Sequence, residues 1–68
     1  MSKVSLSQQI EEVEHELRMR EVVYPKLVLR KQKAQSAADM NMMRMRAVLD
    51  TLKWLQANEA KIKGALAA

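Results

Sequence analysis

The sequence lacks cysteine and phenylalanine, and it holds one glycine and one proline in 68 residues. Without cysteine, neither a disulfide nor a thiolate zinc site can stabilise the chain. With so few turn residues, a β-sheet would have almost no chemistry for its connections. Leucine, methionine, alanine, lysine, glutamine, glutamate and arginine dominate instead, and all are good helix formers. The sequence therefore predicts an all-α fold.

Long apolar runs are also absent. No stretch is apolar for long enough to cross a membrane, and residues 1–5 do not begin a signal peptide, so we expect a soluble, cytoplasmic protein. The 68 residues make one domain with little interior, because domains near this size bury only about 60% of their unfolded surface. Oligomerisation is the common remedy where disulfides and metals are missing, so we expect a homodimer.

The first half of the chain has the pattern of one amphipathic helix. Ser5 and Gln8 have the spacing of an N-terminal capping box. Pro25 lacks a backbone donor and disturbs a helix. The apolar stripe stays in phase across Pro25, so we predict a kinked helix, and a true break with a separate segment up to Arg30 is the alternative. This stripe consists of Leu6, Ile10, Val13, Leu17, Tyr24 and Val28, and a weaker set on the other side consists of Met19, Val22 and Leu29.

The polar run of residues 30–35 predicts the turn between two helices. Ser36 is expected to cap the second helix, with Asp39 at the position from which a carboxylate reaches back. That helix is predicted over about residues 37–63, and Gly64 is expected to stop it. The chain then forms an antiparallel two-helix hairpin, and two copies are expected to form a four-helix arrangement.

The second helix is apolar on two opposite faces. A surface helix of a globular protein usually carries one apolar stripe, and one partner helix cannot cover two. Methionine and tryptophan are enriched at interfaces, so we predict a protein interface on the second face, with a second copy or a foreign protein; four methionines filling a core are the alternative. The hairpin face consists of Ala38, Met45, Val48, Leu49, Leu52, Leu55 and Leu66. The interface face consists of Met40, Met43, Ala47 and Trp54.

Catalytic and metal-binding patterns are missing. His15 is the only histidine and lies among acidic residues. It could ligate a metal or act as a base, but a solvated imidazole is the simpler interpretation, since protein metal sites of this kind need a second histidine or cysteine. One glycine cannot build a phosphate-binding loop. We therefore predict a protein that is not an enzyme and has no catalytic residues, metal or cofactor.

The net charge of +4 is unevenly distributed along the chain. Residues 1–23 carry five acids and three bases, whereas residues 24–68 carry nine bases and three acids. A solvated hairpin end is the plain interpretation of the basic residues near the turn, and a nucleic-acid interface there is the alternative. These residues are Lys26, Arg30, Lys31 and Lys33, with Arg44 and Arg46 further along.

The run of residues 16–28, with Met19 and Arg20 followed by Tyr24 and Pro25, resembles a family of short helical proteins of temperate Mu-like phages and prophages of proteobacteria. The resemblance continues at Ala38 and Asp39 and at residues 45–52, and it covers most of residues 16–55. Family members usually carry Gly-Lys-Met where this chain has Lys-Gln-Lys at residues 31–33.

The resemblance implies a phage-encoded protein that acts inside a bacterial host. Small helical phage proteins of similar size include inhibitors of host proteins, among them quorum-sensing anti-activators of Pseudomonas phages, which are similar in their hairpin-dimer form. Such anti-activators bind a LuxR-type transcription regulator and the type IV pilus assembly ATPase. We therefore expect a protein that binds and inhibits a host protein. A nucleic-acid-binding accessory protein and a structural part of the virion are the alternatives.

Overall fold

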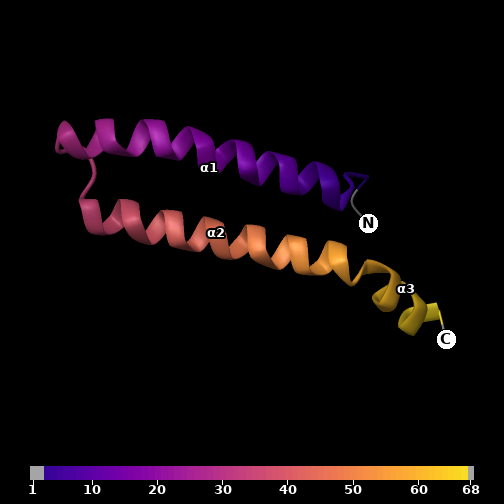
Figure 1. Ribbon diagram of the computed structural model, residues 1–68. Coiled ribbons are helices and arrows are strands. Elements are labelled where there is room, and N and C mark those ends of the chain that lie inside the picture. Colours follow the sequence, from indigo (N-terminus) through magenta and orange to yellow (C-terminus); the bar gives the residue numbers. More distant parts are fainter. Residues whose placement is uncertain (1–2, 68) are drawn as a thin grey trace.

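A computed structural model describes residues 3–67, with the side chains of residues 3–65. It contains the helices α1 (Leu6–Leu29), α2 (Gln35–Ala57) and α3 (Glu59–Ala67). Helices α1 and α2 lie side by side and antiparallel, and α3 extends beyond the open end of the pair (Figure 1). The molecule is elongated, with extents of 54 × 20 × 17 Å. The predicted all-α hairpin is confirmed, and the segment that was predicted as one second helix is divided into α2 and a short α3.

The start of α1 confirms the predicted capping box. The Gln8 backbone N–H donates to the Ser5 hydroxyl over 3.1 Å, and the Ser5 backbone N–H donates to Oε1 of Gln8 over 3.0 Å. From there α1 continues through Pro25 to Leu29 without interruption. Proline offers no N–H to the carbonyl of Glu21, four residues earlier. The helix nevertheless does not stop there, so the alternative of a break at Pro25 is wrong.

The end of α1 is a Schellman turn built on Lys31. The Gln32 N–H donates to the Leu27 carbonyl over 2.9 Å, and the Lys31 N–H donates to the Val28 carbonyl over 3.0 Å. Lys31 itself has a φ of 57°, in the left-handed region. Glycine is the usual residue at this position of the turn. The chain thus ends the helix in a glycine-type turn, although it has lysine at that position.

The start of α2 corrects the predicted cap. Ala34, in an extended conformation, precedes the helix, and no side chain caps it. Ser36 therefore lies inside the first turn, where its hydroxyl cannot reach the free N–H groups as a cap does. The Asp39 carboxylate accepts a hydrogen bond from the Gln35 side chain over 2.9 Å. The helix begins earlier than predicted because the Schellman turn completes the reversal within a few residues.

The end of α2 is also earlier than predicted. Asn58 interrupts the helix, and its side-chain amide and its backbone N–H both donate to the Trp54 carbonyl, over 2.8 and 3.0 Å. Asparagine side chains compete with the helix for such carbonyls. Helix α3 then passes through Gly64, so the prediction of Gly64 as the stop is wrong. The side chain of Leu66, which was predicted on the hairpin face, lies outside the described side chains.

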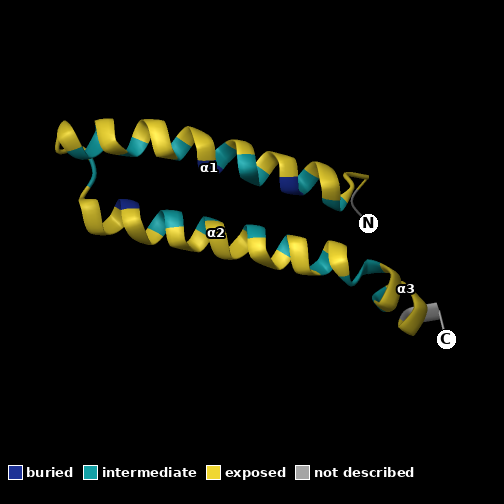
Figure 2. Cartoon of the chain, viewed as in Figure 1, coloured by how far each residue is buried: buried dark blue, intermediate teal, exposed yellow. Residues whose placement is uncertain are grey.

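The core between α1 and α2 is thin. Among the described residues only Ile10, Leu17 and Ala38 are buried, and they lie on the facing sides of the two helices (Figure 2). The predicted stripe of α1 faces this core. The hairpin face of α2 also faces it, except for Val48, which is 45% exposed. The half-buried residues that complete the core are Leu6, Val13, Tyr24, Val28, Met45, Leu49, Leu52 and Leu55.

Polar contacts also join the two helices. Near the open end, the Gln56 amide donates to the Ser7 hydroxyl over 2.8 Å. Further along, the Arg20 guanidinium donates to the Asn41 carbonyl over 3.3 Å while its Nε pairs with Glu16 over 2.8 Å. These contacts join α1 and α2 at two levels along the hairpin.

Candidate functional site

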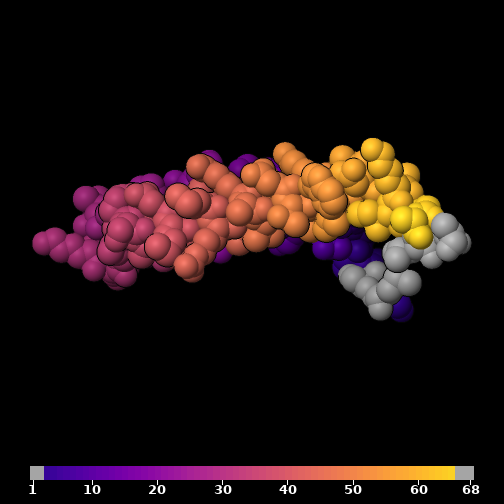
Figure 3. Space-filling model, turned by 90° about the horizontal axis from the view of Figure 1, so that it is seen from below, coloured from indigo at the N-terminus to yellow at the C-terminus, as the bar shows by residue number. Residues whose placement is uncertain are grey.

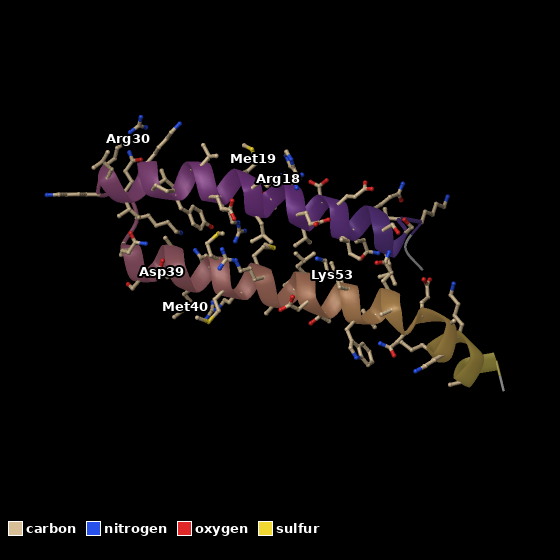
Figure 4. The ribbon with its side chains drawn as sticks, in the orientation of Figure 1. Arg18, Met19, Arg30, Asp39, Met40 and Lys53 are labelled. Carbon is tan, nitrogen blue, oxygen red and sulfur yellow. The ribbon has the colours of Figure 1, made fainter. Side chains whose placement is uncertain are left out.

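The most prominent exposed apolar surface of α2 is the one that the sequence predicted as an interface. We call Met40, Met43, Ala47 and Trp54 the outer face of α2. The side chains of Met43, Trp54 and Met40 are 70%, 60% and 51% exposed, and Ala47 is exposed as well. At about 100° per residue, these four positions fall within one narrow sector of the helix. Figure 4 shows Met40 on the side of α2 that faces away from α1.

Nothing in the described chain covers the outer face of α2. Figure 3 views the molecule from the α2 side, and α2 lies in front along its whole length. Ala47 sits between two shallow grooves on this surface. One groove is largely apolar and includes Val48, Thr51 and Leu52. The other includes Met43 and is bordered by charges.

Charged residues border one side of the outer face. Asp39, Arg46 and Asp50 line the groove beside Met43, and Lys53 continues the row by helical spacing. All four side chains are exposed. Arg46 also approaches Glu21 of α1, with 4.0 Å between nitrogen and oxygen. Acid and base alternate along this edge of α2.

The outer side of α1 carries a second, weaker apolar set. Leu29, Val22 and Met19 are 84%, 57% and 48% exposed, and we call them the outer face of α1. Figure 4 shows Met19 pointing away from α2. The hairpin therefore presents apolar side chains on two opposite sides.

A hollow of about 200 Å³ between the helices was not predicted from the sequence. It lies near the turn and includes Tyr24 and Pro25 of α1 with Ala38 and Met42 of α2. Two cations contact the Tyr24 ring. Cζ of Arg20 lies 5.7 Å from the ring centre, and Nζ of Lys33 lies 4.8 Å from it. In the sequence, only the four-residue spacing of Arg20 and Tyr24 pointed to this site. The hollow itself could not be predicted, because its lining comes from both helices.

The basic end of the hairpin is only partly free. Lys33 is half-buried against Tyr24, whereas Lys26, Arg30 and Lys31 are exposed. In the described part of the chain, the three ion pairs within 4 Å involve other bases. Three accessible cations therefore remain at this end for a nucleic-acid contact, which was the predicted alternative.

The structure places His15 on the exposed side of α1, beside Glu11 and Glu12 along a shallow groove. Among the described residues, no group of three or more histidines, aspartates and glutamates could hold a metal ion. The interpretation as a protein that is not an enzyme remains a prediction.

Comparisons with protein-family models, with curated proteins and with solved structures find no match to this chain. The resemblance to the phage family therefore also remains a prediction. In the part of the chain that the structure describes, no helix has the length and apolar character that crossing a membrane requires.

Proposed function

We propose that this protein acts by binding other proteins. Two copies pair into a four-helix dimer, and the dimer binds and inhibits a host protein during phage infection or lysogeny. The observation that carries this proposal is the uncovered outer face of α2, where Met43 and Trp54 are 70% and 60% exposed. Large exposed apolar patches in soluble proteins mark contacts with other proteins or ligands.

The two opposite outer faces support two separate contacts. The outer face of α2 is the larger and contains the only tryptophan. The outer face of α1 offers Val22 and Leu29 on the other side of the hairpin. If the dimer contact covers one of these faces, the other face remains exposed on both copies and is available to a target protein. Inhibition then needs no catalytic group, because occupying a functional surface of the target is enough.

The candidate targets come from the phage resemblance, which points to a LuxR-type transcription regulator and to the type IV pilus assembly ATPase. The first test uses a purified LuxR-type regulator bound to fluorescently labelled operator DNA. Addition of this protein should release the DNA and lower its fluorescence anisotropy. The second test measures ATP hydrolysis by the pilus ATPase, which should fall. If neither activity changes at saturating concentration, these two targets are wrong.

The nucleic-acid alternative is tested with labelled DNA alone. Counterion release makes binding through three phosphate contacts fall by about 40-fold between 50 and 200 mM salt, whereas an apolar protein contact changes little. The matched variant is Arg30→Ser with Lys31→Ser, which removes two exposed cations and leaves both outer faces intact. Tight binding to DNA that is lost at higher salt and in this variant would favour the alternative over inhibition of a host protein.

A further inference from the structure

We propose that the outer face of α2 is covered by a second copy of this chain, with the two α2 helices antiparallel and crossing at Ala47. This inference rests on the proposed dimer and specifies which face forms it and in which orientation. It also leaves the outer face of α1 as the surface available to a host protein.

The exposed area of the chain supports a partner of this size. The molecule exposes 5620 Å². A compact monomer of 7.8 kDa exposes about 4,400 Å², so this hairpin has roughly 1,200 Å² in excess. A stable protein–protein interface buries about 800 Å² on each partner. One contact along α2 would therefore bring the exposed area close to that of an ordinary small protein.

The order of residues along the outer face fits a two-fold axis at Ala47. Met40 lies seven residues before Ala47, and Trp54 lies seven residues after it. In an antiparallel pair centred on Ala47, Met40 of one copy is therefore level with Trp54 of the second copy, and this contact occurs twice. Sulfur–aromatic contacts of this kind are favourable. The small side chain of Ala47, between its two grooves, allows the helices to approach closely where they cross.

The charged edge of α2 fits the same arrangement. In an antiparallel pair, the same edge of each helix meets across the contact. Arg46 is one residue before Ala47, and Asp50 is three residues after it. Along the helix axis, Arg46 of one copy is therefore only about 3 Å away from Asp50 of the second copy. Asp39 and Lys53, eight residues before and six residues after Ala47, have the same offset. Every acid on this edge thus faces a base of the second copy.

A parallel pair in register would remove this complementarity. In a parallel two-fold pair, opposite edges of the two helices meet, so the charged edge of each copy would face the other edge of its partner. The acids and bases of this edge would then have no opposite charges of the same edge across the contact. Trp54 would be level with Trp54 and Met40 with Met40. The charges therefore select the antiparallel orientation, and the exchange-symmetric contacts close the assembly at two copies.

The absence of cysteine permits a direct test by disulfide cross-linking. Ala47→Cys should form a covalent dimer under mild oxidation at micromolar concentration. Met40→Cys and Trp54→Cys should cross-link when mixed, whereas Met40→Cys alone should not, since its two copies would lie about 21 Å apart along the axis and a disulfide needs Cα atoms within about 7 Å. Met19→Cys, exposed on α1, is the control and should remain monomeric on a non-reducing gel.

A charge exchange tests the same register without touching the apolar residues. Lys53→Asp should raise the dimer dissociation constant about three- to tenfold in sedimentation equilibrium, because it creates two like-charge contacts with Asp39. The double variant Lys53→Asp with Asp39→Lys should restore the wild-type value. In the described part of the chain Lys53 belongs to no ion pair, whereas Arg46 already approaches Glu21, so the pair of Lys53 with Asp39 is the cleaner test.

The outcomes separate this inference from the proposed function. Cross-linking of Met40→Cys with itself would show a parallel pair and overturn the antiparallel one. A wild-type dimer in sedimentation, combined with an Ala47→Cys variant that stays uncross-linked, would place the dimer contact on another face. A monomeric wild-type chain would overturn the dimer altogether, while the assays on the host proteins would still decide the inhibitory function on their own.

Discussion

Lys31 carries the backbone conformation that ends α1. Its φ of 57° lies in a region that costs an L-residue roughly 1–2 kcal/mol, and only a residue without a β-carbon avoids that cost. Two backbone hydrogen bonds, from Lys31 and from Gln32, hold the turn in place. The turn is thus maintained by its backbone hydrogen bonds and not by a local preference of lysine.

Lys31→Gly should therefore stabilise the protein by about 1 kcal/mol, because glycine adopts the left-handed conformation without strain. Urea denaturation at a fixed protein concentration measures the change. Lys31→Ala is the control, since it removes the charge and keeps the β-carbon, and it should leave the free energy of unfolding nearly unchanged. Equal stabilisation by alanine would show that the charge of Lys31, and not its backbone, is the unfavourable feature.

Trp54 and Leu52 lie two residues apart and have different surroundings, since Trp54 is 60% exposed and Leu52 is half-buried. Trp54→Ala should preserve the helical circular dichroism and weaken association by about 2 kcal/mol or more. Leu52→Ala should instead destabilise the hairpin by about 2 kcal/mol, because it removes part of a thin core. Circular dichroism and sedimentation on both variants measure the two effects. If Trp54→Ala unfolds the chain while Leu52→Ala leaves it folded, the two faces have been assigned the wrong way round.

At the scale of the elements, α1 tolerates a proline four residues before the end of a 24-residue helix. The cost is the missing hydrogen bond to the Glu21 carbonyl, and the side of the helix around Pro25 borders the hollow beside Tyr24. The helix persists because the residues on both sides of Pro25, Leu17 and Val28 among them, pack against α2. Tertiary contacts thus outweigh the local preference.

Pro25→Ala should keep the fold and raise the helical content slightly, because it restores one backbone hydrogen bond. The free energy of unfolding should stay the same or increase, by at most about 3 kcal/mol. Thermal unfolding followed by circular dichroism measures this. A loss of cooperativity or of the dimer in this variant would mean that the proline shapes α1 in a way that the packing of the hairpin requires.

The two helix starts offer a matched pair of substitutions. Ser5→Ala removes a capping box that is present, and it should cost about 1 kcal/mol. Ser36→Ala lies inside the first turn of α2 and should cost nothing or stabilise slightly, since alanine is the better helix former. Denaturation of both variants under identical conditions tests the two positions. A larger loss for Ser36→Ala than for Ser5→Ala would contradict the observed start of α2.

At the scale of the whole molecule, the thin core makes association part of stability. Only three of the described residues are buried, and the molecule is 54 Å long and 17 Å thick. A fold of this shape leaves each helix half exposed. If the dimer forms as proposed, unfolding requires dissociation, and the melting temperature must depend on protein concentration.

The melting temperature should therefore rise measurably when the protein concentration is raised a hundredfold in the micromolar range. Differential scanning calorimetry measures the shift, and analytical ultracentrifugation at the same concentrations gives the molar mass. The Trp54→Ala variant is the control and should show a smaller dependence. A molar mass of one chain at every concentration, with a constant melting temperature, would contradict the proposed dimer.

The sequence by itself determined the features that depend on neighbours within a few residues. The shortage of glycine and proline excluded a sheet, the spacing of Ser5 and Gln8 marked the first helix, and the period of the apolar residues separated two faces of the second. Exposure of Met40, Met43 and Trp54 could be predicted for the same reason, because one partner helix covers only one side of α2.

The structure decided how the helices end and what lies between them. The polar run of residues 30–35 placed the turn correctly, but the left-handed conformation of Lys31 and the bond of Asn58 to the Trp54 carbonyl were visible only in the structure. Val48 is 45% exposed although its helical position predicts it on the hairpin face, because the extent to which α1 covers the margin of that face is a property of the packed pair. The hollow at Tyr24 needs side chains from both helices at one level, and that level is set by the packed register, which no periodicity within a single helix contains.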